Sequence, residues 1–111
     1  VHGRGISRFN GYIYVAPDAQ KTEAYQQNNN IVLGEAGRAM TQPQLEIYAD
    51  DVRCSHGATV GQLDAEAIYY MRQRGIPEEA AKALMLNGFI GEILENVSDG
   101  KLREKLTRIM E

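Results

Sequence analysis

The chain of 111 residues contains one cysteine, two histidines and no tryptophan. A single cysteine cannot form a disulfide within the chain, so a fold held together by disulfides is excluded and a reducing, cytoplasmic setting is expected. The sequence also lacks a run of about 18 apolar residues, the minimum for a helix that crosses a bilayer. Disulfide scaffolds and helical membrane proteins are therefore not among the candidates.

An excess of positive charge is missing as well. Twelve Lys and Arg residues stand against fifteen Asp and Glu residues, which gives a formal net charge of −3. Sequence-independent binding to nucleic acids requires a basic surface that displaces counterions from phosphates. We therefore expect no DNA or RNA partner.

The first half of the chain is rich in short stretches typical of β-strands, separated by Gly, Asn, Asp and Pro. They cover residues 12–15, 22–26, 30–33, 45–48 and 52–56. The apolar stretches recur about every 15 to 18 residues, which suits the coils of a parallel β-helix. A weak internal match of residues 14–19 with 47–52, about 33 residues later, is then interpreted as two coils.

An antiparallel meander or sandwich is the alternative for this half of the chain. It predicts two-residue hairpin loops of the Asn-Gly type, and Asn10-Gly11 is the one such dipeptide in this region. The solenoid is favoured, and the antiparallel arrangement stays open.

The second half of the chain has the pattern of helices. Asp64 suits the N-cap of a first helix and Gly75 can end it in a left-handed conformation. Pro77 suits the first position of a second helix, residues 98–100 interrupt the pattern, and a third helix is expected over about residues 101–110. The sequence therefore predicts a mainly β fold with an α appendage, and not an alternating β-α enzyme fold.

Cys54 and His56 are the residues with the clearest chemical potential. Positions two apart on a strand point to the same face, so a thiolate and an imidazole can be presented together to one metal ion. The simpler alternative is a buried thiol beside a hydrogen-bonded histidine. Two ligands are too few for a structural zinc site, so a metal would need ligands from other coils or from a partner chain. A small Cys/His metalloprotein that also uses Asp51, and a generic β-helix binding module, remain open.

Two parts of the sequence resemble a known family. They are residues 44–51 followed by 54–59, and residues 62–64 followed by 74–76. Together they are similar to the C-terminal part of the SufB/SufD family of iron–sulfur cluster assembly proteins. Gly57 follows His56, where SufB-like sequences usually have an acidic residue, so the likeness favours the SufD branch.

This resemblance implies a fold and a division of the chain. Residues 1–62 would form the last coils of a right-handed parallel β-helix, and residues 63–111 a C-terminal helical domain of a longer protein. A solenoid cut at Val1 exposes an unpaired coil edge, so a homodimer of the isolated chain is also predicted.

The resemblance further implies a non-catalytic subunit that works with SufB, as a heterodimer, and with the ATPase SufC. His56 and Cys54 become candidates for cluster assembly near the SufB interface. The nascent iron–sulfur cluster belongs to the full complex, and no cofactor is expected to stay bound to this chain alone. The candidate SufC contacts lie in the helical region: Tyr70, Arg72, Arg74, Ile76, Met85 and Phe89.

Overall fold

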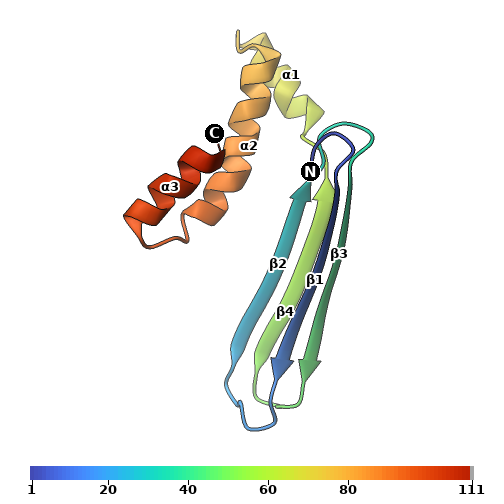
Figure 1. The fold of residues 1–111 in the computed structure, drawn as a ribbon, viewed down its shortest axis with the longest axis vertical. Coiled ribbons are helices and arrows are strands. Elements are labelled where there is room, and N and C mark those ends of the chain that lie inside the picture. The colour runs from blue at the N-terminus through green and yellow to red at the C-terminus, as the bar shows by residue number, and fades with distance from the viewer. Residues whose placement is uncertain (111) are drawn as a thin grey trace. The chain divides into compact units, whose positions relative to one another are not determined.

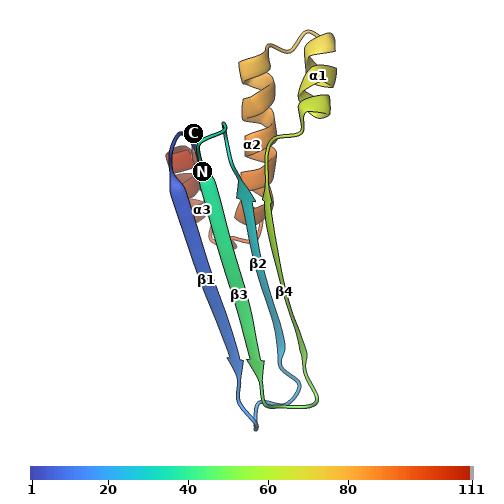
Figure 2. The ribbon, with the colours of Figure 1, turned by 90° about the vertical axis from the view of Figure 1, so that its right-hand side faces the viewer.

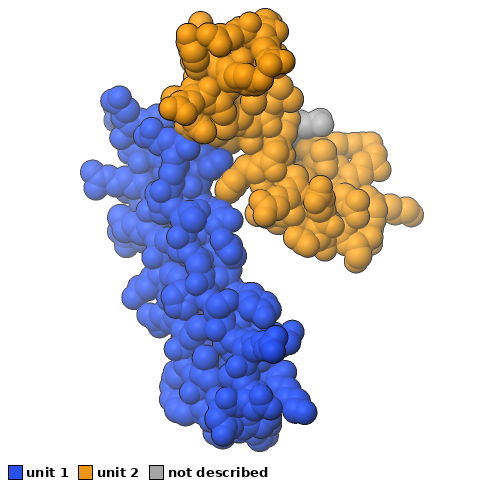
Figure 3. All heavy atoms as spheres, turned by 180° about the vertical axis from the view of Figure 1, so that it is seen from behind, with its two compact units in different colours: residues 1–62 blue, residues 63–111 orange. Residues whose placement is uncertain are grey.

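The computed structural model describes residues 1–110 of the chain. These residues form two compact units, 1–62 with the strands and 63–110 with the helices. Figure 3 colours the two units separately. The first unit contains the strands of the chain, and the second contains its helices.

The strand unit consists of two parallel sheets of two strands each. In chain order the strands are β1 (Ile6–Val15), β2 (Glu23–Ile31), β3 (Arg38–Ile47) and β4 (Arg53–Gly61). β1 pairs in parallel with β3, and β2 pairs in parallel with β4. Figures 1 and 2 show β1 and β3 running in one direction and β2 and β4 in the other. The chain therefore alternates between the two sheets, and the antiparallel alternative is wrong.

The expected repeat length has to be corrected. Ile6 pairs with Arg38 and Glu23 pairs with Arg53, so the chain returns to the same sheet only after two strands. The interval of about 15 to 18 residues separates successive strands in opposite sheets, and the internal match about 33 residues apart spans one turn of the chain, not two. The spacing of successive strands was taken as the length of a whole coil, although each turn of this chain contains two strands, one in each sheet.

The strands are also longer than the sequence pattern indicated. β1 and β3 contain ten residues each, and β2 contains nine. β2 joins two stretches that were expected to be separate, because its Gln and Asn residues continue the ladder with β4. Asn29 accepts hydrogen bonds from the side chains of Gln27 (3.0 Å) and Thr59 (3.0 Å), so the polar run is stabilised within the sheet.

Alternate residues of the strands differ in burial, as expected for sheets with one covered face. In β1 half-buried and exposed residues alternate along the strand, which ends at Val15 with 2% exposure. Gly11 belongs to the covered row, and a Cβ atom placed on it would lie 1.9 Å from Nε2 of Gln26. Gln26 therefore reaches across from β2 to β1, and Asn10-Gly11 is not a hairpin but part of a strand.

The turns between the strands contain the expected turn residues. Asp50 and Asp51 lie in the bend between β3 and β4, and Gly34 has a φ angle of 87° in the bend after β2. Lys21 has a φ angle of 61°, although it is not glycine. Its N–H donates to the carbonyl of Asp51 at 2.5 Å, which ties neighbouring turns together.

The helical unit contains α1 (Ala65–Gln73), α2 (Glu78–Leu94) and α3 (Gly100–Met110). The Asp64 side chain caps α1 by accepting from two backbone N–H groups, and Gly75 ends the turn after α1 with a φ angle of 89°. Both predictions are confirmed. Pro77 is the N-cap of α2 and not its first residue. Within residues 1–110, none of the helices has both the length and the apolar character needed to cross a membrane.

The helical unit buries little of its apolar surface. Ala81 is its single buried residue within the described range, while Tyr69, Leu84, Ile93 and Ile109 are each more than half exposed. Burial of apolar surface is the main stabilising term for packed helices. This unit therefore leaves apolar side chains available for contacts with other surfaces.

Candidate functional site

Cys54 and His56 both lie on β4, two residues apart and thus on the same face of the strand. Cys54 is half-buried and His56 is exposed. In the parallel pairing with β2, Cys54 is opposite Ala24 and His56 is opposite Gln26. The thiol and the imidazole therefore share the face of the β2–β4 sheet that carries Gln26.

This face is the one turned toward the other sheet. Gln26 meets Gly11 of β1, whereas the next residue, Gln27, lies against Gly57 on the opposite face, 3.7 Å from the position of a Cβ atom on that glycine. His56 is nevertheless exposed, and within the described residues β4 has a strand neighbour on one side only. A partner that covers this edge would meet the imidazole directly.

The capacity of this place for metal binding is limited. Among residues 1–110, no group of three or more His, Cys, Asp and Glu residues is arranged to hold a metal ion. The set of Asp51, Cys54 and His56 is therefore not assembled here. Two side chains alone do not complete the four-ligand shell of a typical structural site, so a metal ion bound here would need further ligands.

Four candidate residues of the helical unit, Tyr70, Arg72, Arg74 and Ile76, lie at or near the turn that joins α1 to α2, and Met85 and Phe89 lie further along α2. The Arg74 guanidinium lies 4.6 Å from the centre of the Tyr70 ring, a cation–π contact between exposed side chains. Ile76 is half-buried in the turn, and Met85 and Phe89 are half-buried on α2, four residues apart on one face. Each of these side chains thus keeps some exposure to solvent.

Arg72, another candidate, is part of a small charge network at the start of α2. Its guanidinium lies 3.5 Å from the Glu78 carboxylate, and Lys82 lies 3.2 Å from the same group. The hydrogen bond and charge of Lys82, followed by the charge of Arg72, lower the pKa of Glu78. Glu78 in turn raises the pKa of Lys82. The positive charge of Arg72 is therefore partly compensated within the chain.

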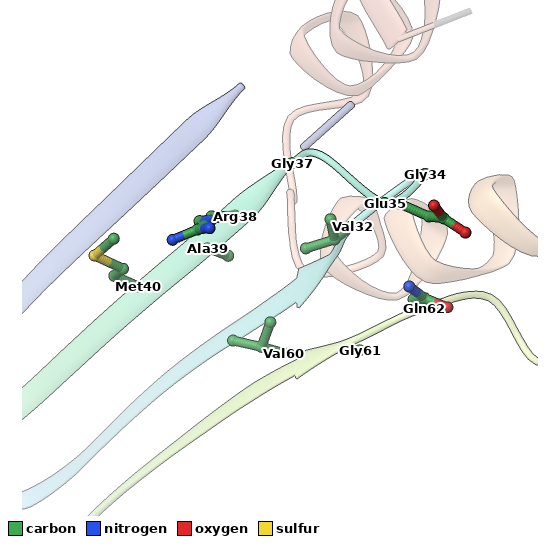
Figure 4. Close-up of a pocket in the computed structure, with 10 residues that line it drawn as sticks. All are labelled: Val32, Gly34, Glu35, Gly37, Arg38, Ala39, Met40, Val60, Gly61 and Gln62. Carbon is green, nitrogen blue, oxygen red and sulfur yellow. The ribbon is translucent and has the colours of Figure 1, made fainter. Parts of the chain in front are cut away.

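A groove in the strand unit was not predicted from the sequence. It has a volume of about 410 Å³ and is lined by the ends of β2 and β4, the bend after β2 and the start of β3. Figure 4 shows the lining residues on these neighbouring segments, with the Glu35 carboxylate pointing away from Val60 and Met40. The apolar lining includes Val32, Ala39, Met40 and Val60. No sequence motif marks it, because its residues come from two separate segments, 32–40 and 60–62.

The sequence alone also did not identify Gln26, the register partner of His56, or Gly11, against which the Gln26 amide lies. Glycine inside a strand pattern often marks a close approach of another group, which is the signal that Gly11 carried. Gln26 gave no comparable signal, since its position opposite His56 follows only from the strand register.

Comparison with known proteins gives a consistent family. The model for the SUF system FeS cluster assembly SufBD core domain matches residues 1–89. The chain is 45% identical over 106 residues to the iron-sulfur cluster assembly protein SufD of Escherichia coli (strain K12), which covers 96% of this chain and 25% of that protein. It is 33% identical over 105 residues to SufD of Bacillus subtilis (strain 168), covering 95% of this chain and 24% of that protein.

A third relative is a SufBD family protein of Synechocystis, 43% identical over 98 residues, which covers 88% of this chain and 22% of that protein. The chain thus spans about a quarter of the length of these relatives. Their names describe assembly proteins and not enzymes. Because the family model covers residues 1–89 of 111, the chain belongs to the SufBD family of the SUF iron–sulfur cluster assembly system.

Proposed function

We propose that this chain supplies the C-terminal part of a SufD-type, non-catalytic subunit that assembles with SufB and SufC in the cytoplasm. The observation that carries the proposal is the position of His56 and Cys54 on β4, on one face of an edge strand, in a chain of the SufBD family. An edge strand has unpaired backbone groups that can join a partner. The side chains on such a strand then lie at the interface.

The strand unit is interpreted as the last coils of a right-handed parallel β-helix, residues 1–62, with residues 63–111 as a separate helical domain. The alternation of the chain between two parallel sheets supports this interpretation. The same free edges support a homodimer of the isolated chain. Light scattering across a range of concentrations tests the homodimer, and a strict monomer at high concentration would contradict it.

His56 and Cys54 would act on the nascent cluster as cargo of the complex. A neutral imidazole can bind iron or carry a proton near neutral pH, and a thiol must become a thiolate before it binds a metal. His56 is exposed whereas Cys54 is half-buried, so we assign the main role to His56 and an auxiliary role to Cys54. The other ligands would come from SufB, since this chain does not assemble a third.

The SufC contact would lie on the helical unit. Tyr70, Arg72 and Arg74 are exposed, and the half-buried side chains of Ile76 and Phe89 provide apolar anchors. Interfaces commonly combine an aromatic or aliphatic centre with arginine, as this surface does. The small amount of apolar surface buried within the helical unit supports the same assignment.

Substitution of His56 tests the cluster role. In the complete protein, His56→Ala should leave complex formation intact but lower the iron and acid-labile sulfide that purify with the complex under anaerobic conditions. Cys54→Ser should have a milder effect. Ser55→Ala is the matched control, because Ser55 lies between them and points to the opposite face. Wild-type iron content and wild-type cluster delivery in His56→Ala would refute the assignment.

Substitutions on the helical unit test the SufC contact. Phe89→Ala and Ile76→Ala should each weaken SufC binding by about 2 kcal/mol if they are buried anchors, and charge reversal at Arg72 or Arg74 should weaken it as well. Arg53→Glu, on the strand unit, is the control. Circular dichroism must show that each variant is folded. Unchanged affinity for SufC in folded variants would remove the docking assignment.

A further inference from the structure

Gln26 has an amide oxygen whose bonding is incomplete. Within residues 1–110, its Oε1 atom is buried and has no hydrogen-bond partner. A buried acceptor without a donor is costly, so native proteins nearly always supply one. A hydrogen-bond donor for this oxygen is therefore expected close to it.

The position of Gln26 restricts the answer. Gln26 and His56 are register partners in the parallel β2–β4 pair, so their side chains stand side by side on one face, on strands about 4.8 Å apart. On the other side, the amide fills the space that Gly11 leaves free, where a Cβ atom would lie 1.9 Å from Nε2. The amide thus lies against β1, on the face of the β2–β4 sheet that it shares with His56.

Two other polar side chains lie on the strands near Gln26. Asn30 donates through Nδ2 to Oδ1 of Asn28 at 2.7 Å and to the carbonyl of Thr59 at 3.1 Å. Thr41, whose Oγ1 is the other buried polar atom without a partner in the described range, is paired with Phe9 and not with Gly11. The imidazole of His56 is the adjacent donor on the same face.

We infer that Gln26 is a positioning residue for His56: rotation of the imidazole toward its register neighbour would let a ring N–H donate to the unpartnered Gln26 Oε1 atom. This bond fixes which ring nitrogen carries the proton. It leaves the other nitrogen with its lone pair free to bind a metal ion or accept a proton, because the tautomer of a histidine is set by the hydrogen bond of its second nitrogen. The significance of this orientation rests on the proposed role of His56, but the hydrogen bond itself does not.

The tautomer of His56 provides the test. The complete protein is labelled with ¹⁵N-histidine and studied by long-range ¹H–¹⁵N correlation above neutral pH, with the His56 signals assigned by their loss in His56→Gln. Gln26→Leu should change the ratio of the two tautomers about fivefold, the factor that corresponds to a net hydrogen bond of about 1 kcal/mol. Gln26→Glu keeps an acceptor and should retain the wild-type preference. Gln27→Leu, on the opposite face, should leave the ratio unchanged.

A second variant keeps the inference testable if Gln26→Leu does not fold. Gly11→Ala leaves Gln26 in place but pushes its amide away, so it should shift the tautomer ratio in the same direction. The inference is overturned if the ratio stays at the wild-type value in folded Gln26→Leu and Gly11→Ala, or if Gln27→Leu changes it equally.

The iron content of the His56→Ala complex tests the cluster role independently of the tautomer ratio. A shifted ratio supports the Gln26–His56 bond even if His56→Ala loads iron normally, which would refute only the cluster role. If His56→Ala loses iron while the ratio is insensitive to Gln26, the bond is overturned and the cluster role stands.

Discussion

Replacement of Gly11 by alanine is the most direct test of how the two sheets of the strand unit pack. The added Cβ atom would lie 1.9 Å from Nε2, 2.5 Å from Cδ and 2.6 Å from Oε1 of Gln26, all far inside contact distance. The amide must therefore move. Overpacking of this kind usually costs about 1 to 3 kcal/mol, while exchange of glycine for alanine inside a strand returns about 0.5 to 1 kcal/mol. We expect a net loss of about 1 to 2 kcal/mol in the free energy of unfolding.

The double substitution separates this clash from other effects of alanine. With Gln26→Ala in place the obstructing amide is gone, so Gly11→Ala should become neutral or stabilising by up to about 1 kcal/mol. The coupling energy between the two positions should be about 2 kcal/mol. Urea unfolding followed by tyrosine fluorescence suits a chain with six tyrosines and no tryptophan, and hydrogen exchange of β1 and β2 peptides assigns the transition to the strand unit.

Two results would contradict this interpretation of how Gln26 packs over Gly11. If Gly11→Ala destabilises the protein equally with and without the Gln26 side chain, the amide is not what occupies the space above Gly11. If Gly11→Ala stabilises the otherwise unchanged protein, the register that places Gln26 there is wrong.

Three further predictions concern single positions. Lys21→Gly should raise the free energy of unfolding by about 0.5 to 1 kcal/mol in urea titrations, because Lys21 has a φ angle of 61°; a loss would contradict this. Asp64→Ala should cost α1 about 1 kcal/mol, seen as faster hydrogen exchange at Glu66, whose N–H donates to Asp64 at 2.9 Å; unchanged exchange would refute the cap. The lowered pKa of Glu78 means that its ion pair with Lys82 stabilises α2 above about pH 4.5 and is lost as the pH falls through the lower folded-state value. Glu78→Gln should remove that acid-dependent loss of helicity, measured by circular dichroism at low salt, and an unchanged profile would refute it.

The sequence correctly predicted which parts of the chain form strands and which form helices, but not the length of the strand repeat. Caps and breakers act locally, so Asp64 and Gly75 could be placed correctly from neighbouring residues alone. The parallel arrangement was predicted, but its register depends on contacts about 30 residues apart, which no local pattern encodes. The run of Gln and Asn in β2 is poor in apolar residues, so its strand character arises from side-chain ladders and sheet context, as in the bond from Thr59 to Asn29.

The candidate site was predictable only in part for a similar reason. Spacing alone placed Cys54 and His56 on one face of a strand, because strand periodicity is two. Their neighbours depend on register: Gln26 lies opposite His56, and Gly11 comes from a strand in the other sheet. The residues that orient a functional group are set by this three-dimensional arrangement, and the groove near Val32 is set in the same way.

The helical unit offers a last test, because Ala81 is its single buried residue within the described range. Ala81, with 0% exposure, follows shortly after the turn that folds the chain back from α1. Ala81→Leu adds three carbon atoms where no space is available, so it should destabilise the helical unit by about 1 to 3 kcal/mol. Ala80→Leu makes the same chemical change at an exposed position and should have little effect.

If the proposed SufC surface depends on how α1 and α2 pack, Ala81→Leu should also lower SufC affinity, although neither alanine belongs to that surface. Hydrogen exchange of α1 and α2 peptides and titration with SufC measure both properties in the same variants. Equal stability of the two leucine variants would show that the space around Ala81 can expand. Lost stability with unchanged SufC affinity would show that SufC does not recognise the packed helix pair, and the docking surface would then have to be sought on another part of the chain.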